Sequence, residues 1–179
     1  MTSRNKNLWI GGLAVLLVAG YAIFVSTRWN GMSSAYGRSG TQALEALTRL
    51  RAQAASDTKE YDPRLKDAQM AVAEANHAMR TDVDKAAQTV LDTYLEAIQW
   101  SRLSSATLEA TKGGYPALVK QRQESYDLDV ETINACEKEA RQLFDKRSQR
   151  DATSNGQCAA ARRKVVDAIM QDQPQQNLP

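Results

Sequence analysis

The sequence predicts an all-α protein, in which one N-terminal transmembrane helix precedes an antiparallel bundle of about four to five helices. Three observations predict this fold. Residues 8–25, LWIGGLAVLLVAGYAIFV, contain no charge. After residue 40, apolar residues recur at steps of three and four, which is the period of a helix face. Short polar stretches containing Gly or Pro separate these periodic segments, and no segment shows the alternation of a strand.

The apolar segment is long enough to remain in a membrane. Twenty helical steps separate Trp9 from Trp29, which places the two indoles ~30 Å apart, close to the thickness of the hydrocarbon core. Tryptophan favours the two membrane interfaces. The alternative is a secretion signal cleaved after Ser33-Ser34-Ala35, but a cleavage site normally follows the apolar run more closely. We therefore expect a retained anchor.

The charges that flank this segment leave its orientation open. Arg4 and Lys6 precede it, and Arg28 and Arg38 follow it, so the positive-inside rule does not choose between the two sides. The free α-amino group and the two cysteines favour residues 1–7 as a cytoplasmic tail and an exported bundle. Because no Asn-x-Ser/Thr sequon occurs, we expect a bacterial inner membrane with the bundle in the periplasm. The alternative is a cytoplasmic bundle with reduced cysteines.

Small residues in the span favour contact with other membrane helices. Gly12 and Ala19 share one face of the predicted helix, and Gly20 lies at its edge. Small side chains let a second helix approach closely, although no G-x-x-x-G motif occurs. The alternative is that these residues have no packing role, since glycine and alanine are common in membrane spans.

The remaining chain divides into a linker, a bundle and a tail. Residues 26–40 are rich in Ser and Gly and predict a flexible linker, residues 41–171 predict the bundle, and the Pro- and Gln-containing residues 172–179 predict a disordered tail. The first helix of the bundle should start at residue 41, with an apolar seam through Leu44, Leu47, Leu50 and Ala54.

The second and third helices have clear starts. Asp62-Pro63 suits an N-cap followed by the first helical residue, and Thr81 with Asp84 resembles a capping box. The seam of the second helix is Leu65, Ala68, Val72, Ala75 and Met79. The seam of the third is Val83, Ala87, Val90, Tyr94, Ala97, Ser101, Ser105 and Leu108.

Gly113-Gly114 ends the third helix and Pro116 opens the fourth. The seam of the fourth helix is Val119, Tyr126, Val130, Ile133, Cys136 or Glu137, Ala140 and Leu143. A shorter fifth helix, over about 158–170, should bury Val165, Val166 and Ile169.

A disulfide between Cys136 and Cys158 is expected in an exported domain. It requires the fourth helix to end near Lys146, because a straight helix continuing to residue 151 would hold Cys136 ~22 Å from its end. The polar segment RSQRDATSNGQ can then run back along the helix. The alternative is two small buried thiols.

The composition predicts a thin core and no nucleic-acid partner. Among the 139 residues from 41 to 179, 23 are Leu, Val, Ile or Phe, and alanine fills much of the remaining helix interior. A thin core predicts dependence on a partner, on a second copy of the chain or on the disulfide. All 21 acidic and 19 of the 23 basic residues lie after residue 40, so this part carries a net charge of −2. The cluster Arg162-Arg163-Lys164 is typical of a solvated helix face rather than of a nucleic-acid site.

No residue pattern predicts catalysis, a cofactor or a metal site. His77 is the only histidine, and its helical neighbours include one acid, Glu74. The acidic residues of DLDVE (127–131) lie inside a helical seam without the glycine of a calcium loop. Nucleotide-binding, nucleophile-elbow and zinc-protease motifs are absent from the sequence. We expect no enzymatic activity.

Trp100 and Leu103 fall off the seam of the third helix. An exposed tryptophan is a natural contact for a partner, whereas the alternative is that another helix of the bundle covers the pair. The sequence therefore predicts a membrane-anchored interaction or structural subunit that contacts the lipid bilayer and other membrane proteins of a complex. The alternative is a periplasmic sensor or ligand-binding bundle that acts through a partner membrane protein.

Overall fold

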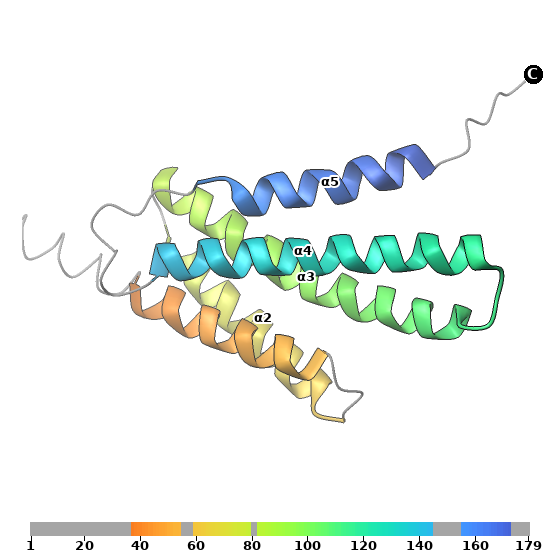
Figure 1. The fold of residues 1–179 in the computed structure, drawn as a ribbon. Helices are drawn as coiled ribbons and strands as arrows, with labels where there is room; N and C mark the ends of the chain where they lie inside the picture. The colour runs from red at the N-terminus through yellow and green to blue at the C-terminus, as the bar shows by residue number, and fades with distance from the viewer. Residues whose placement is uncertain (1–36, 55–58, 80–81, 145–154, 173–179) are drawn as a thin grey trace, which may run out of the picture. The chain divides into compact units, whose positions relative to one another are not determined.

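The computed structural model describes residues 37–54, 59–79, 82–144 and 155–172, and these form five helices without a strand (Figure 1). The first covers residues 37–54. The other four, in chain order, are α2 (Tyr61–Ala78), α3 (Asp82–Thr111), α4 (Pro116–Phe144) and α5 (Gln157–Asp172). The all-helical class and the predicted helices of the bundle are confirmed.

The predicted span 8–25 lies outside the described residues, together with Trp9, Gly12, Ala19, Gly20 and Trp29. So do most of the predicted linker and residues 173–179 of the tail. Within the part of the chain that the structure does describe, no helix combines the length and the apolar character that crossing a bilayer requires.

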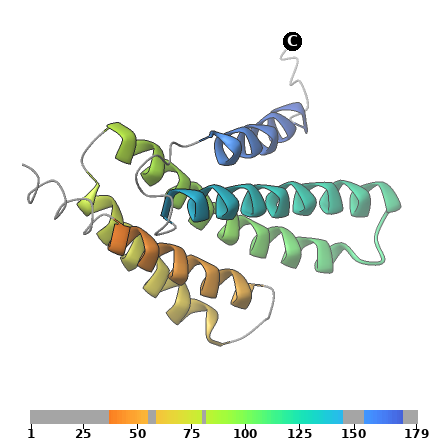
Figure 2. The ribbon, with the colours of Figure 1, turned by 60° about the vertical axis from the view of Figure 1, so that its left-hand side comes forward.

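The helix over 37–54, α3 and α5 each run antiparallel to α4. At the start of the helix over 37–54, the hydroxyl of Thr41 donates a hydrogen bond to the carbonyl of Phe144 at 3.2 Å, and further along the same helix Arg51 contacts the side chain of Asn134 at 2.6 Å. The helix over 37–54 and α2 lie side by side in both ribbon views (Figures 1 and 2). The long pair of α3 and α4 contacts this hairpin and also α5.

Glycine and proline mark the turn between α3 and α4, as the sequence predicts, but proline does not mark the first residue of α2. Gly113 has a φ of +90°, which glycine tolerates, and Pro116 is the first residue of α4. However, α2 begins at Tyr61 rather than at Pro63. Asp62 is therefore not the N-cap but an acid in the first turn, where it still complements the positive end of the helix dipole.

The bundle begins earlier than the sequence predicts. Residues 37–40, assigned to the linker, are helical, and Gly40 is buried. A Cβ atom on Gly40 would lie 2.2 Å from Cε1 of Phe144. The absence of a side chain, which suggested flexibility, instead lets this helix approach the end of α4 closely.

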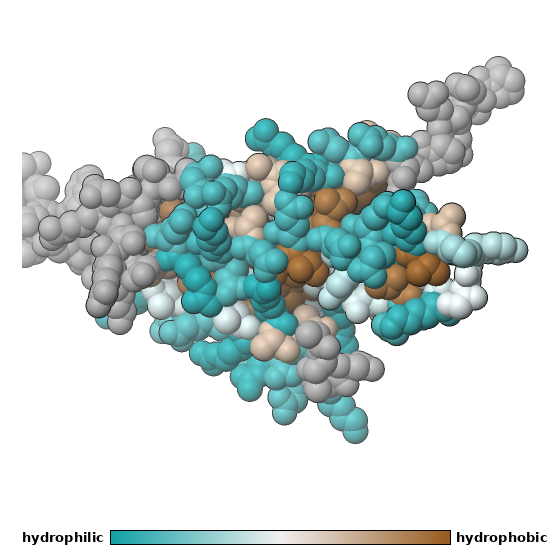
Figure 3. Space-filling model, viewed as in Figure 1, coloured by the Kyte–Doolittle hydropathy of each residue, from teal (hydrophilic) through white to brown (hydrophobic). Residues whose placement is uncertain are grey.

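Most of the predicted seam residues are buried, but Leu65 on α2 and Val119, Tyr126 and Val130 on α4 are only partly buried. The side chain of Val83 lies outside the described part of the chain. Of the three residues predicted to be buried in the fifth helix, however, only Val165 is buried, whereas Val166 and Ile169 are exposed. The largest fully buried apolar side chains are Tyr94, Phe144, Leu47, Leu50, Leu91 and Ile98. Polar side chains cover most of the face in Figure 3, and apolar residues show between α4 and α5 and at the far end of the α3–α4 hairpin.

Candidate functional site

A disulfide joins α4 to the start of α5. Cys136 and Cys158 are bonded, with their Cα atoms 4.3 Å apart, and both are buried. The predicted bond is thereby confirmed. The condition placed on it also holds, because α4 ends at Phe144, close to the predicted end near Lys146.

Beside the disulfide, the buried carboxylate of Glu139 caps α5. It accepts hydrogen bonds from the backbone N–H groups of Gly156 at 3.0 Å and Cys158 at 2.8 Å. The first N–H groups of a helix have no partner within the helix, and a carboxylate satisfies them and complements the dipole. The contact crosses from one helix to another, so no local pattern in the sequence could reveal it. Glu139 therefore has a structural role.

A second carboxylate, Glu137, links three helices. It accepts hydrogen bonds from the hydroxyl of Tyr94 at 3.1 Å and from Arg141 at 2.6 Å, and it forms an ion pair with Arg51. Burial favours the neutral acid, but the hydrogen bonds from Arg141, Arg51 and Tyr94 outweigh it and lower the pKa of Glu137. Burial, and next the charge of Glu137, raise the pKa of Tyr94. Because Tyr94, Arg51 and Arg141 all bond to Glu137, we assign this network a structural role in joining the helices.

Two residues of the basic cluster fix α5 to the long hairpin. Arg162 pairs with Glu96 of α3 at 3.0 Å, and Lys164 pairs with Glu131 of α4 at 2.5 Å. Together with the disulfide and Glu139, these pairs define where α5 lies. The cluster is therefore partly an internal tie rather than a free basic surface.

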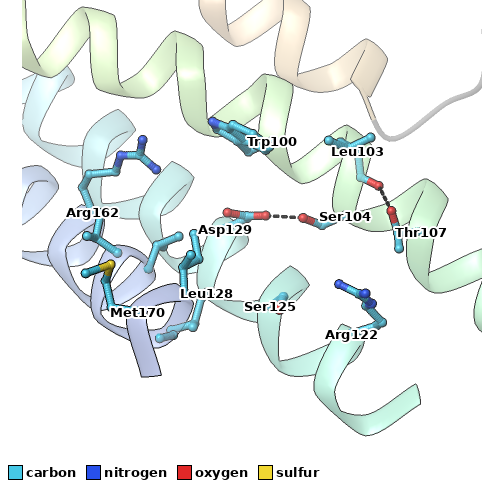
Figure 4. A pocket seen from close by; sticks show the side chains of 14 residues that line it. Trp100, Leu103, Ser104, Thr107, Arg122, Ser125, Leu128, Asp129, Arg162 and Met170 are labelled. Carbon is cyan, nitrogen blue, oxygen red and sulfur yellow. Dashed lines mark hydrogen bonds between the residues drawn. The ribbon is translucent and has the colours of Figure 1, made fainter. Parts of the chain in front are cut away.

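An open groove lies between α3 and α5, with α4 as its floor (Figure 4). We refer to it as the α3–α5 groove; its volume is about 330 Å³. Its lining consists of Trp100, Leu103, Ser104, Thr107, Arg122, Ser125, Leu128, Asp129, Arg162, Val165, Val166, Ala168, Ile169 and Met170.

The predicted pair Trp100 and Leu103 lies in this groove, and no described helix covers it. Trp100 is 45% exposed and Leu103 is 56% exposed. Val166, Ile169 and Met170 of α5 are exposed on the opposite wall. The sequence singled out the α3 wall because its residues fall off the seam. It missed the α5 wall because two of these residues were assigned to the core.

Two charged residues of α4 add polarity to the groove. Asp129 is buried and accepts a hydrogen bond from the hydroxyl of Ser104 at 2.5 Å. Burial raises the pKa of Asp129, although the bond from Ser104 and the charge of Arg162 act in the opposite direction. At the far end, Arg122 is exposed, and none of the ion pairs among the described residues includes it.

The described residues offer no metal site. No group of three His, Cys, Asp or Glu side chains among them could hold an ion. His77 is exposed. The acids of DLDVE have separate environments, since Asp127 accepts a bond from Gln123, Asp129 lies in the groove floor and Glu131 pairs with Lys164.

A second hollow, of about 540 Å³, lies beside Phe144. Its charged residues pair within the protein, Arg49 with Glu45 and Arg141 with Glu137. These charges are therefore already neutralised, whereas the α3–α5 groove combines exposed apolar walls with Arg122. The groove is the better candidate site.

Comparison of the chain with protein-family models, with curated proteins and with solved structures found no match.

Proposed function

We propose that the chain is a membrane-anchored, non-enzymatic subunit of a larger membrane protein complex, and that its periplasmic bundle binds a protein partner. The uncharged segment 8–25 supports the anchor. The disulfide supports an oxidising compartment, because disulfides persist outside the cytosol.

The exposed apolar walls of the groove carry this proposal. Tryptophan and methionine are enriched at protein interfaces, and Trp100 lines one wall of the groove and Met170 the other (Figure 4). A partner that covers them would remove apolar area from water, at roughly 25 cal/mol per Å². The thin core of the bundle makes such added burial valuable for stability.

The size of the groove favours a second candidate, a ligand-binding bundle. A volume of about 330 Å³ falls at the lower limit of small-molecule sites. Such sites bury most of their ligand, whereas the walls here are about half exposed. A ligand-dependent rise in melting temperature of the purified chain would favour this candidate over the first.

A matched pair of substitutions tests the interaction role. Leu103 in the groove and Met70 on α2 are exposed to the same extent, 56% and 55%. We expect Leu103→Glu to dissociate the complex when membranes with native levels of the chain are extracted in mild detergent and analysed by size. Met70→Glu should leave the complex intact. A wild-type chain that migrates as a monomer, without crosslinked neighbours, would refute the proposed function.

The compartment requires its own test, because the two native cysteines are buried in their disulfide. Met70→Cys places a thiol on the exposed surface of α2. A membrane-impermeant maleimide should label it in intact cells, from the periplasmic side. Labelling only after lysis would place the bundle in the cytoplasm.

A further inference from the structure

We propose that the α3–α5 groove binds one amphipathic helix of the partner, in which apolar residues face the groove and an acidic residue of the first turn pairs with Arg122. This inference rests on the proposed function, because it specifies the segment that the bundle would recognise.

The arrangement of α3, α4 and α5 leaves one place of a four-helix bundle empty. Both α3 and α5 pack on α4, and they are joined to each other by the pair between Glu96 and Arg162. Beyond this pair, the side chains of α4 from Arg122 to Asp129 line the groove between them. A helix in the groove would contact α3 and α5 as neighbours and lie diagonally opposite α4.

The length of the groove sets the length of the segment. Its lining runs from Trp100 to Thr107 on α3 and from Arg162 to Met170 on α5. At ~1.5 Å per residue these stretches measure ~11–12 Å, or about two helical turns. The bound helix therefore needs apolar residues at positions i, i+3 or i+4, and i+7, which is the pattern of helix-in-groove recognition.

A second copy of this chain does not supply such a segment from its described residues. Outside the groove, the exposed large apolar side chains are Met70 on α2, Tyr115 in a turn and Leu118 on α4, each on a separate element. None forms an apolar stripe. Only α5 exposes a stripe, and its first turn contains no acid. Because the described residues supply no such segment, and in keeping with the proposed interaction role, the occupant in this proposal is a helix of another protein.

The packing of an up-down bundle indicates the direction of the bound helix, and Arg122 indicates the charge at its N-terminus. Neighbouring helices in an up-down bundle run antiparallel, so a helix between α3 and α5 runs in the direction of α4. Its N-terminus then lies at the level of Arg122 and Thr107, the start of α4 and the end of the α3 stretch. An acid in its first turn would be stabilised both by its own helix dipole and by Arg122.

Photocrosslinking in cells tests the inference. A benzophenone amino acid replaces Thr107 at one end of the α3 wall, Val166 in the middle of the α5 wall, or Met70 as the control outside the groove. The full-length chain is kept at native levels, and crosslinked segments are identified by mass spectrometry. We expect positions 107 and 166 to capture one helical segment with the stated apolar spacing, its acidic N-terminal turn at 107 and its later turns at 166. Position 70 should not capture it.

The captured segment, made as a peptide, is then titrated against the full chain in nanodiscs. Trp100→Ala should weaken binding at least ~30-fold, as for an interface hot spot. Arg122→Glu should weaken it roughly threefold to fivefold, as for an exposed ion pair, and exchanging the acid of the peptide for Lys should restore binding to this variant. Arg163→Glu, at an exposed arginine that does not line the groove, should change nothing.

The outcomes separate this inference from the proposed function. Capture of a second copy of the chain, of lipid alone or of a segment without the apolar spacing overturns the helix-binding inference. Capture of a partner at position 70 but not in the groove, with the complex intact, also overturns it and leaves the interaction role standing. A monomer without crosslinks at any position refutes both.

Discussion

Two aromatic residues on α3 illustrate how the two ends of the bundle differ. Tyr94 is fully buried and donates its hydroxyl hydrogen to Glu137, whereas Trp100, less than two turns further along, is nearly half exposed. At the disulfide end, the carboxylates of Glu137 and Glu139 find hydrogen-bond partners on other helices or at their starts. At the groove end, α3 and α5 leave the floor of α4 open. The same long helices therefore build one complete core and one incomplete core.

Two carboxylates of α4 repeat this contrast electrostatically. Glu137, at the disulfide end, has a lowered pKa because its hydrogen bonds to Arg141, Arg51 and Tyr94 outweigh its burial. Asp129, in the groove floor, has a raised pKa because its burial outweighs the bond from Ser104. The surroundings at the disulfide end therefore favour the ionised form of Glu137, whereas those at the groove end disfavour the ionised form of Asp129.

The largest expected effect compares two aromatic truncations. Phe144→Ala should lower the free energy of unfolding by about 3–5 kcal/mol, because it empties a fully buried site. Trp100→Ala should lower it by less, because nearly half of the indole is already exposed to water. Chemical denaturation of the full chain in detergent, followed by circular dichroism, measures both. Similar losses for the two variants would mean that the ends do not differ as described.

Removal of the disulfide should have the next largest effect. The variant with both Cys136→Ala and Cys158→Ala should lose about 3 kcal/mol, because the bond closes a loop with a sequence separation of 22. It should also expose α5, one wall of the groove, to limited proteolysis. The matched control is the wild-type chain unfolded under reducing conditions. If the variant and the oxidised wild type unfold at the same denaturant concentration, the bond does not secure this end.

Two amide variants, Glu137→Gln and Asp129→Asn, should change the stability of the fold by smaller amounts and in opposite directions. Glu137→Gln should cost about 1–2 kcal/mol at neutral pH, because hydrogen bonds to a charged group are lost. Since the folded pKa is below the ordinary 4.5, this stabilisation is present above 4.5 and disappears as the pH falls through the folded value.

Asp129→Asn should raise the melting temperature at neutral pH, by roughly 2 °C. The folded pKa of Asp129 is above the ordinary 3.8, so the carboxyl favours folding below 3.8 and loses that contribution as the pH rises through the folded value. Thermal unfolding across the acidic range measures both variants. A stabilising Glu137→Gln or a destabilising Asp129→Asn at neutral pH would reverse the assignment of the two ends.

The sequence predicted the parts of this fold that depend on helical periodicity. Leu47 and Leu50 are buried because they repeat on one face. The disulfide was expected from two cysteines in an exported domain, on the condition that the fourth helix ends near Lys146. The off-seam position of Trp100 left two possibilities, an exposed residue or one covered by another helix, and the structure shows it nearly half exposed.

Contacts between distant segments escaped prediction, because periodicity describes one helix at a time. Glu139 gives no local sign that it caps α5, and nothing in α3 indicates that Ser104 will bond Asp129. Val166 and Ile169 match a helical face as well as Val165 does, but α4 covers only part of α5. Which of two adjacent apolar faces is buried depends on the neighbour.

The central claim is that a protein partner completes the groove end, and one footprinting measurement tests it directly. Met70 and Met170 are both largely exposed, at 55% and 65%, but only Met170 lines the groove. Hydroxyl-radical oxidation is compared between native membranes and the purified full chain. We predict that Met170 and Trp100 are protected in membranes, whereas Met70 is oxidised equally in both. Equal oxidation of Met170 and Trp100 in the two samples would contradict the account.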